Sequence, residues 1–204
     1  MSDFSERIIG LYERHAVEWD ADRQNSYWND KRWHDRFIET LPQGARVLDL
    51  GCGSGSPVAR HLVDQGLKIT GINGSARMIA LAAGRLPTQE WIVSDMRSLS
   101  LGRQFNGILA WDSFFHLNPR SQRQMFAVFA RHAGPGTMLM FNTGPAHGEA
   151  IGSYRGDPLY HASLDADEYE ALLNRVGFDV IAHAINDAEA GGRTVWLARS
   201  PVRS

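Results

Sequence analysis

The chain of 204 residues is long enough for one α/β domain with a sizeable buried core. Its net charge is −2, and residues of both signs are mixed along the chain, so there is no basic block to bind nucleic acid or an anionic membrane. No apolar run reaches membrane-spanning length. The single cysteine, Cys52, excludes an internal disulfide, and the first residues are too polar for a signal peptide. We therefore expect a cytoplasmic protein that binds neither nucleic acid nor membrane.

Two helices are predicted before the first strand. Residues 4–18 carry apolar side chains at helical spacing, and a second helix is expected from Trp33 to Leu41, where Pro42 stops it. The segment between them mixes aromatic with basic side chains, Trp19 and Arg23 among them. These aromatic rings could cover a ligand or only the edge of the core, and the sequence leaves both open.

The chain is organised around residues 46–56, which predict a strand, a glycine-rich turn and the start of a helix. The run around Val47 and Leu48 is typical of a buried parallel strand. Three glycines then bring bare backbone close to a helix N-terminus, an arrangement that suits a polar ligand. Their spacing is G-x-G-x-G, with Ser56 where dinucleotide-binding folds need a further glycine. This spacing disfavours a nicotinamide-dependent oxidoreductase.

Asp49 lies inside the same strand and completes the pattern D-x-G-x-G-x-G. The stretch resembles motif I of the class I S-adenosylmethionine (SAM)-dependent methyltransferases. The resemblance implies an α/β, Rossmann-like fold: a seven-stranded, mostly parallel sheet with helices on both faces and an antiparallel C-terminal hairpin. It also implies one methyltransferase domain over residues 1–204, with a helical lid (1–43) and a SAM-binding core (44–200).

The resemblance implies SAM as cofactor, with S-adenosylhomocysteine (SAH) as its product, and a site at the strand ends. In the family an acid after the second strand, here residues 67–72, binds both ribose hydroxyls. This chain has Asn73 there, whose amide offers a donor as well as an acceptor, so weaker or reoriented ribose binding is expected. After the third strand (91–93), Asp95 and Met96 match the adenine site. The expected cofactor residues are Asp49, Gly51, Cys52, Gly53, Gly55, Asn73, Gly74, Met78, Asp95, Met96 and Trp111.

The fourth strand begins at residue 105 and runs into the turn that carries Asp112 and His116. Ligands of open α/β sheets bind beyond the carboxyl ends of the strands, so these side chains are expected near the reacting methyl group. Asp112 is a candidate substrate residue. His116 is the first candidate for a catalytic base, because histidine accepts a proton near neutral pH, but a hydrogen-bonded structural role is equally compatible with the sequence.

The rest of the chain predicts a helix (120–132), a Gly-Pro-Gly turn, a strand (137–143), a last helix from Asp165 and two final antiparallel strands (178–183 and 194–198). A long polar loop is expected from residue 144 to 161. Its Tyr160 and His161 are candidate substrate residues. No pair of side chains there has metal-ligand spacing, so no metal is expected.

The expected function is therefore transfer of a methyl group from SAM to an N, O or S atom of a small molecule. Compact size and the lack of a basic face favour a small-molecule acceptor, and Trp111-Asp112-Ser113-Phe114 stands where DNA and glutamine N-methyltransferases carry Asn-Pro-Pro-Tyr. The alternative is a catalytically weak or inactive SAM- or nucleoside-binding protein of the same fold, motivated by Asn73. The acceptor, the methylated atom and the oligomeric state stay open.

Overall fold

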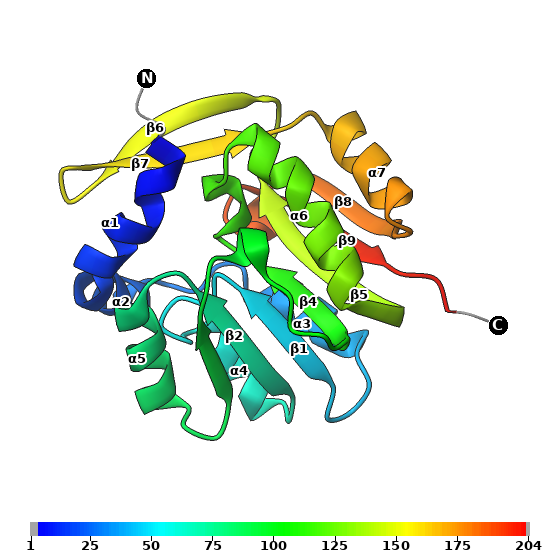
Figure 1. The fold of residues 1–204 in the computed structure, drawn as a ribbon, viewed down its shortest axis with the longest axis horizontal. Helices are drawn as coiled ribbons and strands as arrows, with labels where there is room; N and C mark the ends of the chain where they lie inside the picture. The colour runs from blue at the N-terminus through cyan, green and yellow to red at the C-terminus, as the bar shows by residue number, and fades with distance from the viewer. Residues whose placement is uncertain (1–3, 203–204) are drawn as a thin grey trace.

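A seven-stranded sheet forms the centre of the computed structural model, which describes residues 4–202 (Figure 1). The strand order is β3-β2-β1-β4-β5-β9-β8, with β1 to β5 parallel and β9 antiparallel to both β5 and β8. This order confirms the predicted fold class and the C-terminal hairpin. The strands are β1 Arg46–Leu50, β2 Lys68–Asn73, β3 Glu90–Val93, β4 Phe105–Ala110, β5 Ala133–Thr143, β8 Asp179–Asp187 and β9 Arg193–Arg199.

Helices cover both faces of the sheet because the side chains of each central strand alternate between two apolar layers. Leu48 and Leu50 pack with Phe126 on one face, whereas Val47 packs with Phe37 on the other. The α-helices are α1 Ile8–Arg14, α2 Ala16–Asn25, α3 Lys31–Glu39, α4 Val58–Asp64, α5 Ala76–Arg85, α6 Pro119–His132 and α7 Ala166–Arg175. Short 3-10 turns lie at η1 Phe4–Arg7, η2 Met96–Ser98, η3 Phe114–His116 and η4 Ala188–Ala190. Among residues 4–202, no helix has the length and apolar character needed to cross a lipid bilayer.

Helix starts follow local capping chemistry. Ser75 precedes α5, and its hydroxyl accepts a hydrogen bond from the backbone N–H of Met78 at 3.1 Å. Asn118 caps α6 in the same way, and Pro119 occupies the first helical position, where its missing N–H costs nothing. These caps place both helices directly after the strand ends that carry the site.

The predicted turn at residues 134–136 is wrong, because β5 already begins at Ala133. Ala133 pairs with Phe105, and the register shifts before Met138 pairs with Gly107. The Gly-Pro-Gly segment is therefore an irregularity within the strand rather than a separate turn.

The prediction of an unstructured loop over residues 144–161 is also wrong. This segment forms a two-stranded antiparallel sheet of β6 Gly148–Tyr154 and β7 Asp157–Ser163, drawn in yellow in Figure 1. Arg155 and Gly156 both have positive φ (49° and 88°), as a tight two-residue hairpin turn requires. Nearly all of β6 is exposed, so its sequence lacks the apolar alternation by which strands are recognised.

The residues before β1 divide into two parts. We call residues 4–25 the N-terminal arm; they form η1, α1 and α2, with a break at His15 where one helix was predicted. The arm packs between α5 and β7 (Figure 1). Helix α3 instead belongs to the core, where Trp33 and Phe37 are buried. The idea that residues 1–43 act as a lid stays a prediction.

Candidate functional site

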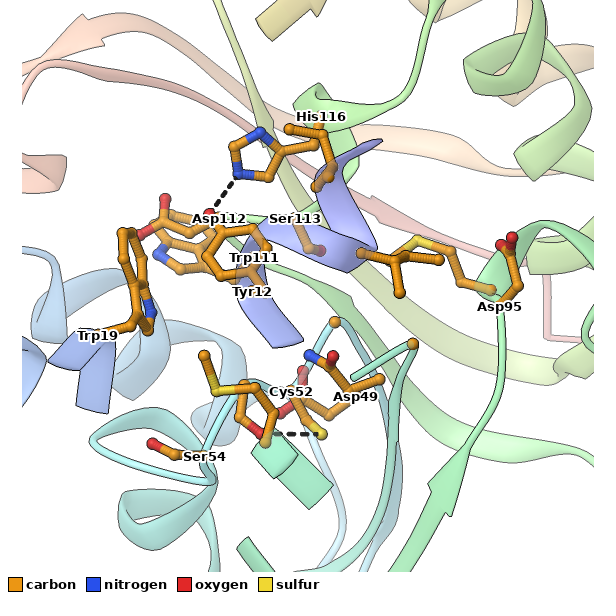
Figure 2. Close-up of a pocket in the computed structure, with 18 of the residues that line it drawn as sticks. Tyr12, Trp19, Asp49, Cys52, Ser54, Asp95, Trp111, Asp112, Ser113 and His116 are labelled. Atoms are coloured by element: carbon orange, nitrogen blue, oxygen red, sulfur yellow. Dashed lines mark hydrogen bonds between the residues drawn. The ribbon is translucent and has the colours of Figure 1, made fainter. Parts of the chain in front are cut away.

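Two cavities meet beneath the N-terminal arm, beyond the carboxyl ends of the parallel strands. The loop-side cavity, of about 130 Å³, lies against the glycine-rich turn after β1. The hairpin-side cavity, of about 590 Å³, lies between the arm, the end of β5 and the β6–β7 hairpin. Five residues line both cavities and so mark their junction: Tyr12, Trp19, Arg23, Asp112 and His116. Figure 2 shows four of them, Tyr12, Trp19, Asp112 and His116, facing the residues of the turn.

The structure brings nearly all of the predicted cofactor residues together. Those that line the loop-side cavity are Asp49, Gly51, Cys52, Gly53, Asn73, Gly74, Met78, Asp95, Met96 and Trp111. Gly55 lines neither cavity. It has a φ of +75°, and a Cβ there would lie 3.2 Å from Trp91 and 3.3 Å from Ala82. Gly55 therefore lets the turn pack closely on neighbouring elements, and its role toward a cofactor stays a prediction.

Gly51 is required by the close approach of two loops. Its φ is +83°, and a Cβ would lie 2.2 Å from the Cβ of Ser113. The Ser113 hydroxyl donates to the carbonyl oxygen of Leu50 at 2.6 Å. The turns after β1 and β4 are thus held together where only glycine fits.

Asp49 is a buried carboxyl group that no cation of the described residues neutralises. It is 4% exposed, and no hydrogen bond or ion pair to its side chain occurs among residues 4–202. Burial raises the pKa of this carboxyl to about 7. Figure 2 shows Asp49 beside Cys52 at the edge of the loop-side cavity. A cationic ligand group there would pair with the carboxylate.

Asn73 turns its side-chain oxygen toward its own loop. Oδ1 accepts a hydrogen bond from the backbone N–H of Ser75 at 2.9 Å. The amide NH₂ is consequently the part of Asn73 left to donate to a ligand, whereas an acid at this position would offer a second acceptor oxygen.

Asp95 is bound by Arg97 across the turn after β3. Its carboxylate accepts from the backbone N–H of Arg97 at 2.9 Å and from the guanidinium at distances down to 2.6 Å. Burial alone would raise the pKa of Asp95, but the hydrogen bonds and charge of Arg97 hold it below its ordinary value. Glu6 of the N-terminal arm binds the same guanidinium. Asp95 therefore keeps its charge while it shapes the loop.

Two more acids of the arm bind the loops after β2 and β1. Glu13 accepts from the Ser75 hydroxyl at 2.6 Å and from the backbone N–H of Arg77 at 3.1 Å. Asp20 accepts a hydrogen bond from the hydroxyl of Ser54. Glu6, Glu13 and Asp20 are thus spaced seven residues apart along the arm. They bind the loops after β3, β2 and β1, respectively. The arm thus forms one wall of the loop-side cavity.

His116 has both ring nitrogens engaged. Nδ1 lies 2.8 Å from the carbonyl oxygen of Tyr160, which can only accept, so Nδ1 carries the hydrogen. Nε2 therefore accepts from the hydroxyl of Tyr12, at 2.8 Å, along a dashed line in Figure 2. Burial lowers the pKa of His116 to about 4 and raises that of Tyr12 above its ordinary value. Both groups are neutral at physiological pH, and the Tyr12 hydroxyl binds the ring nitrogen of His116 that lacks a hydrogen.

Asp112 is held in an uncommon backbone conformation at the end of β4. Its φ is 48°, and its carboxylate accepts from Arg193 Nε and NH2 at 2.7 and 2.8 Å. Asn142 donates to the same carboxylate at 2.9 Å. Burial would raise the pKa of Asp112, but the paired guanidinium holds it below its usual range. Asp112 is therefore a fixed negative charge at the junction.

The two substrate candidates of the hairpin have different positions. His161 lines the hairpin-side cavity, where its ring centroid lies 4.9 Å from that of His116 and 5.1 Å from that of Phe115. Tyr160 lines neither cavity, because its side chain is buried beside Ile8 in a small apolar cluster. Only its carbonyl oxygen reaches the site. In residues 4–202, no three His, Cys, Asp or Glu side chains are grouped to hold a metal ion.

Several lining residues were not predicted from the sequence. Tyr12, Trp19 and Arg23 lie on one face of the arm, at spacings of seven and four residues, and helical periodicity could have grouped them. Asn142 and Arg193 come from β5 and β9, and no local pattern marks them.

A family model described as a methyltransferase domain matches residues 19–183. The chain belongs to the class I SAM-dependent methyltransferases. The fold of this chain is similar to that of the DhpI–SAH complex, with a TM-score of 0.75, 20% identity and 98% of each chain covered. It is also similar to the magnesium protoporphyrin IX methyltransferase (ChlM) from Synechocystis PCC 6803 with bound SAM, with a TM-score of 0.74, 15% identity and 98% of each chain covered.

Relatives with closer sequences match over shorter stretches. The chain is 34% identical over 116 residues to the demethylmenaquinone methyltransferase of Thermotoga maritima, covering 54% of this chain and 50% of that protein. It is 37% identical over 93 residues to the dTDP-3-amino-3,6-dideoxy-alpha-D-glucopyranose N,N-dimethyltransferase of Streptomyces fradiae, covering 45% of this chain and 35% of that protein. The chain thus spans half or less of the length of these two relatives.

Proposed function

We propose that this protein binds SAM in the loop-side cavity and transfers its methyl group to a nitrogen, oxygen or sulfur atom of a small molecule in the hairpin-side cavity. The observation that carries the proposal is the junction: the two cavities meet at Tyr12, Asp112 and His116. A donor and an acceptor could approach each other there without leaving the protein. Such positioning can supply much of the rate enhancement of a displacement reaction.

The residues of the loop-side cavity suit SAM. Asp49 is a buried carboxyl that has no cationic partner among residues 4–202 and would pair with the ammonium group. Gly51 and Gly53 give close access to backbone, and residues of the arm form part of the cavity wall. When bound, SAM supplies a methyl group on a sulfonium, which is a good leaving group.

Tyr12 and His116 would handle the acceptor's proton. The Tyr12 oxygen can accept a hydrogen bond from an N–H or O–H of the acceptor while its own proton lies on the line to His116 Nε2. As the acceptor loses its proton to Tyr12, the Tyr12 proton passes to His116. The negative charge of Asp112 favours the imidazolium that forms. In this scheme Tyr12 touches the acceptor and His116 acts through it.

The walls of the hairpin-side cavity favour a small acceptor with an apolar or ring-shaped body. The apolar side chains of Trp19, Phe115 and Leu159 line it, and Asn142 and Asp112 add polar groups. Similar proteins are named for both atom types: one is an N,N-dimethyltransferase of a dTDP-linked amino sugar, and another is an O-methyltransferase of malonyl-[acyl-carrier protein]. Nitrogen and oxygen acceptors are therefore the first to test.

The test is a screen with methyl-labelled SAM against amino sugars, phenols, hydroquinones and small acids, read as acceptor-dependent SAH formation. Wild type should methylate at least one class. Asp49→Asn should raise the SAM concentration needed, and Tyr12→Phe should lower turnover. Acceptor-dependent turnover that both variants leave unchanged would contradict the assigned roles.

A SAM-binding protein with little or no turnover is the second candidate. The hydrogen bond from Ser75 to Oδ1 of Asn73 favours this candidate, because it leaves the amide NH₂ to face the ribose. A carboxylate at this position could accept hydrogen bonds from both ribose hydroxyls, whereas the NH₂ can only donate. Tight SAH binding with no methylation across the screen, and none after Asn73→Asp, would support this candidate over the enzyme.

A further inference from the structure

Four charged side chains of alternating sign run from the core to the junction. Asp30, 1% exposed, lies 3.6 Å from Arg193, which forms the two-pronged pair with Asp112 described above. Asp112 in turn lies 3.6 Å from NH1 of Arg23. The series therefore ends on a cation, Arg23, and this cation lines both cavities.

Arg23 is not needed to neutralise Asp112. That carboxylate already accepts two hydrogen bonds from Arg193 and one from Asn142. The side chain of Arg23 makes no hydrogen bond to any of residues 4–202, and its one ion pair is the 3.6 Å contact. Its guanidinium offers five N–H donors, and it is 25% exposed, toward the cavities that it lines.

The other arginines that line the cavities are already paired. Arg193 donates to Asp112 and, through NH1, to the carbonyl oxygen of Ala190 at 2.8 Å. Arg97 is bound by Asp95 and Glu6. Among the described residues, Arg23 is thus the cavity-lining guanidinium with donors to spare.

We propose that Arg23 binds a carboxylate at the junction of the two cavities. A planar guanidinium and a carboxylate pair through parallel hydrogen bonds, which fix orientation as well as position. The bound anion would extend the alternating series Asp30, Arg193, Asp112 and Arg23 by one more negative group.

The carboxylate has two possible sources. The amino-acid part of SAM carries an ammonium and a carboxylate, and Asp49 accounts only for the first. The alternative source is an acid group on the methyl acceptor in the hairpin-side cavity, a reading that rests on the proposed function. In both cases the ligand chemistry at Arg23 is the same, and binding measurements separate the two.

The first experiment compares SAH with 5′-methylthioadenosine, which lacks the amino-acid part, by calorimetry on Arg23→Gln, Arg23→Lys and wild type. Arg120→Gln is the matched control, because Arg120 is exposed and lines neither cavity. If the cofactor is the source, Arg23→Gln weakens SAH about tenfold or more and leaves 5′-methylthioadenosine unchanged. Arg23→Lys keeps the positive charge but not the planar guanidinium, so its SAH affinity should lie between those of Arg23→Gln and wild type.

The second experiment saturates each protein with SAH and adds benzoate or benzamide, which differ in charge at one group. If the acceptor is the source, wild type binds benzoate, Arg23→Gln loses it, and benzamide binding is the same in both proteins. The proposal is overturned if Arg23→Gln leaves SAH affinity unchanged and benzoate is either not bound by wild type or bound equally by the variant. SAH binding without methyl transfer would contradict the proposed function. The binding measurements would still show whether Arg23 binds a carboxylate, because they do not require turnover.

Discussion

The hydroxyl of Tyr12 donates to Nε2 of His116 at 2.8 Å, although the two residues are 104 positions apart in the chain. The contact joins the N-terminal arm to the turn after β4. It also determines how His116 can take part in chemistry, because Nε2, the ring nitrogen without a hydrogen, is bound by the Tyr12 hydroxyl. Both side chains line the hairpin-side cavity, and in the proposed scheme an acceptor gives its proton to Tyr12.

Tyr12→Phe should lower kcat about 10- to 100-fold and change SAH affinity less than threefold, because a proton-transfer group is removed and the ring is kept. Turnover with the best acceptor and SAH titration measure the two effects. Tyr27→Phe removes a hydroxyl from an exposed side chain and serves as control. A wild-type kcat in Tyr12→Phe would rule out the tyrosine as the proton carrier.

SAM affinity should depend on pH through Asp49. Its pKa of about 7 in the free protein means that the carboxyl is protonated below pH 7, and pairing with an ammonium requires that this proton leave. The dissociation constant of SAH should therefore rise by up to about tenfold per pH unit below 7 and level off above it. Calorimetry between pH 5.5 and 8.5 measures this.

The pH dependence has two controls. The ligand 5′-methylthioadenosine has no ammonium and should show a flat profile. Asp49→Asn should bind SAH more weakly and lose the slope. An equal slope in Asp49→Asn would assign the titration to another group.

Gly51→Ala should destabilise the protein and weaken SAH binding, because the new Cβ overlaps Ser113 in addition to straining a positive φ. Gly66→Ala is a close control: its φ is +84°, and nothing lies within 4 Å of the added Cβ. Gly66→Ala should cost about 1–2 kcal/mol from strain alone, and Gly51→Ala at least about 1 kcal/mol more. Chemical denaturation compares them, and equal losses would mean that the close approach is unimportant.

Gly74→Ala should loosen the N-terminal arm. A Cβ at this position would lie 2.7 Å from Ile9, and the backbone there has no positive φ to be strained. We expect SAH to dissociate about 5- to 10-fold faster in stopped-flow measurements, because the contact that seals the loop-side cavity is pushed apart. Ile9→Ala in the same chain should restore the slower rate.

The control for the arm is Gly84→Ala, which lies in α5 with open space around it. It should leave the dissociation rate unchanged and stabilise the helix by about 0.5–1 kcal/mol. A dissociation rate in Gly74→Ala equal to that of wild type would show that the arm does not hold the ligand.

Asn73→Asp should tighten SAH binding about 3- to 10-fold. One carboxylate oxygen can keep the hydrogen bond from Ser75, and the second becomes an acceptor for a ribose hydroxyl. Calorimetry of SAH measures the gain, and the amino-acid homocysteine, which has no ribose, should show none. Weaker SAH binding would mean that the amide NH₂ of Asn73 makes a contact that the carboxylate cannot replace.

The fold and most of the loop-side cavity were predictable from the sequence because their signals are local. A buried strand, its acid and three glycines occupy ten consecutive positions, and parallel strands bring their carboxyl ends to one edge of the sheet. The β6–β7 hairpin was not predictable, since β6 exposes nearly every side chain and is held by its pairing with β7 and not by an apolar face.

By itself the sequence determined the class of fold, and it predicted the glycine-rich turn, Asp49 and Asp112 at the strand ends where the cavities lie. Only the tertiary structure decided what those groups meet. Arg193 reaches Asp112 across 81 positions because β9 inserts beside β5, and Arg23 reaches the same carboxylate because the arm folds back over the strand ends. These contacts depend on how elements far apart in the chain pack together. The sequence around Asp112, Arg193 or Arg23 carries no local pattern that predicts such packing.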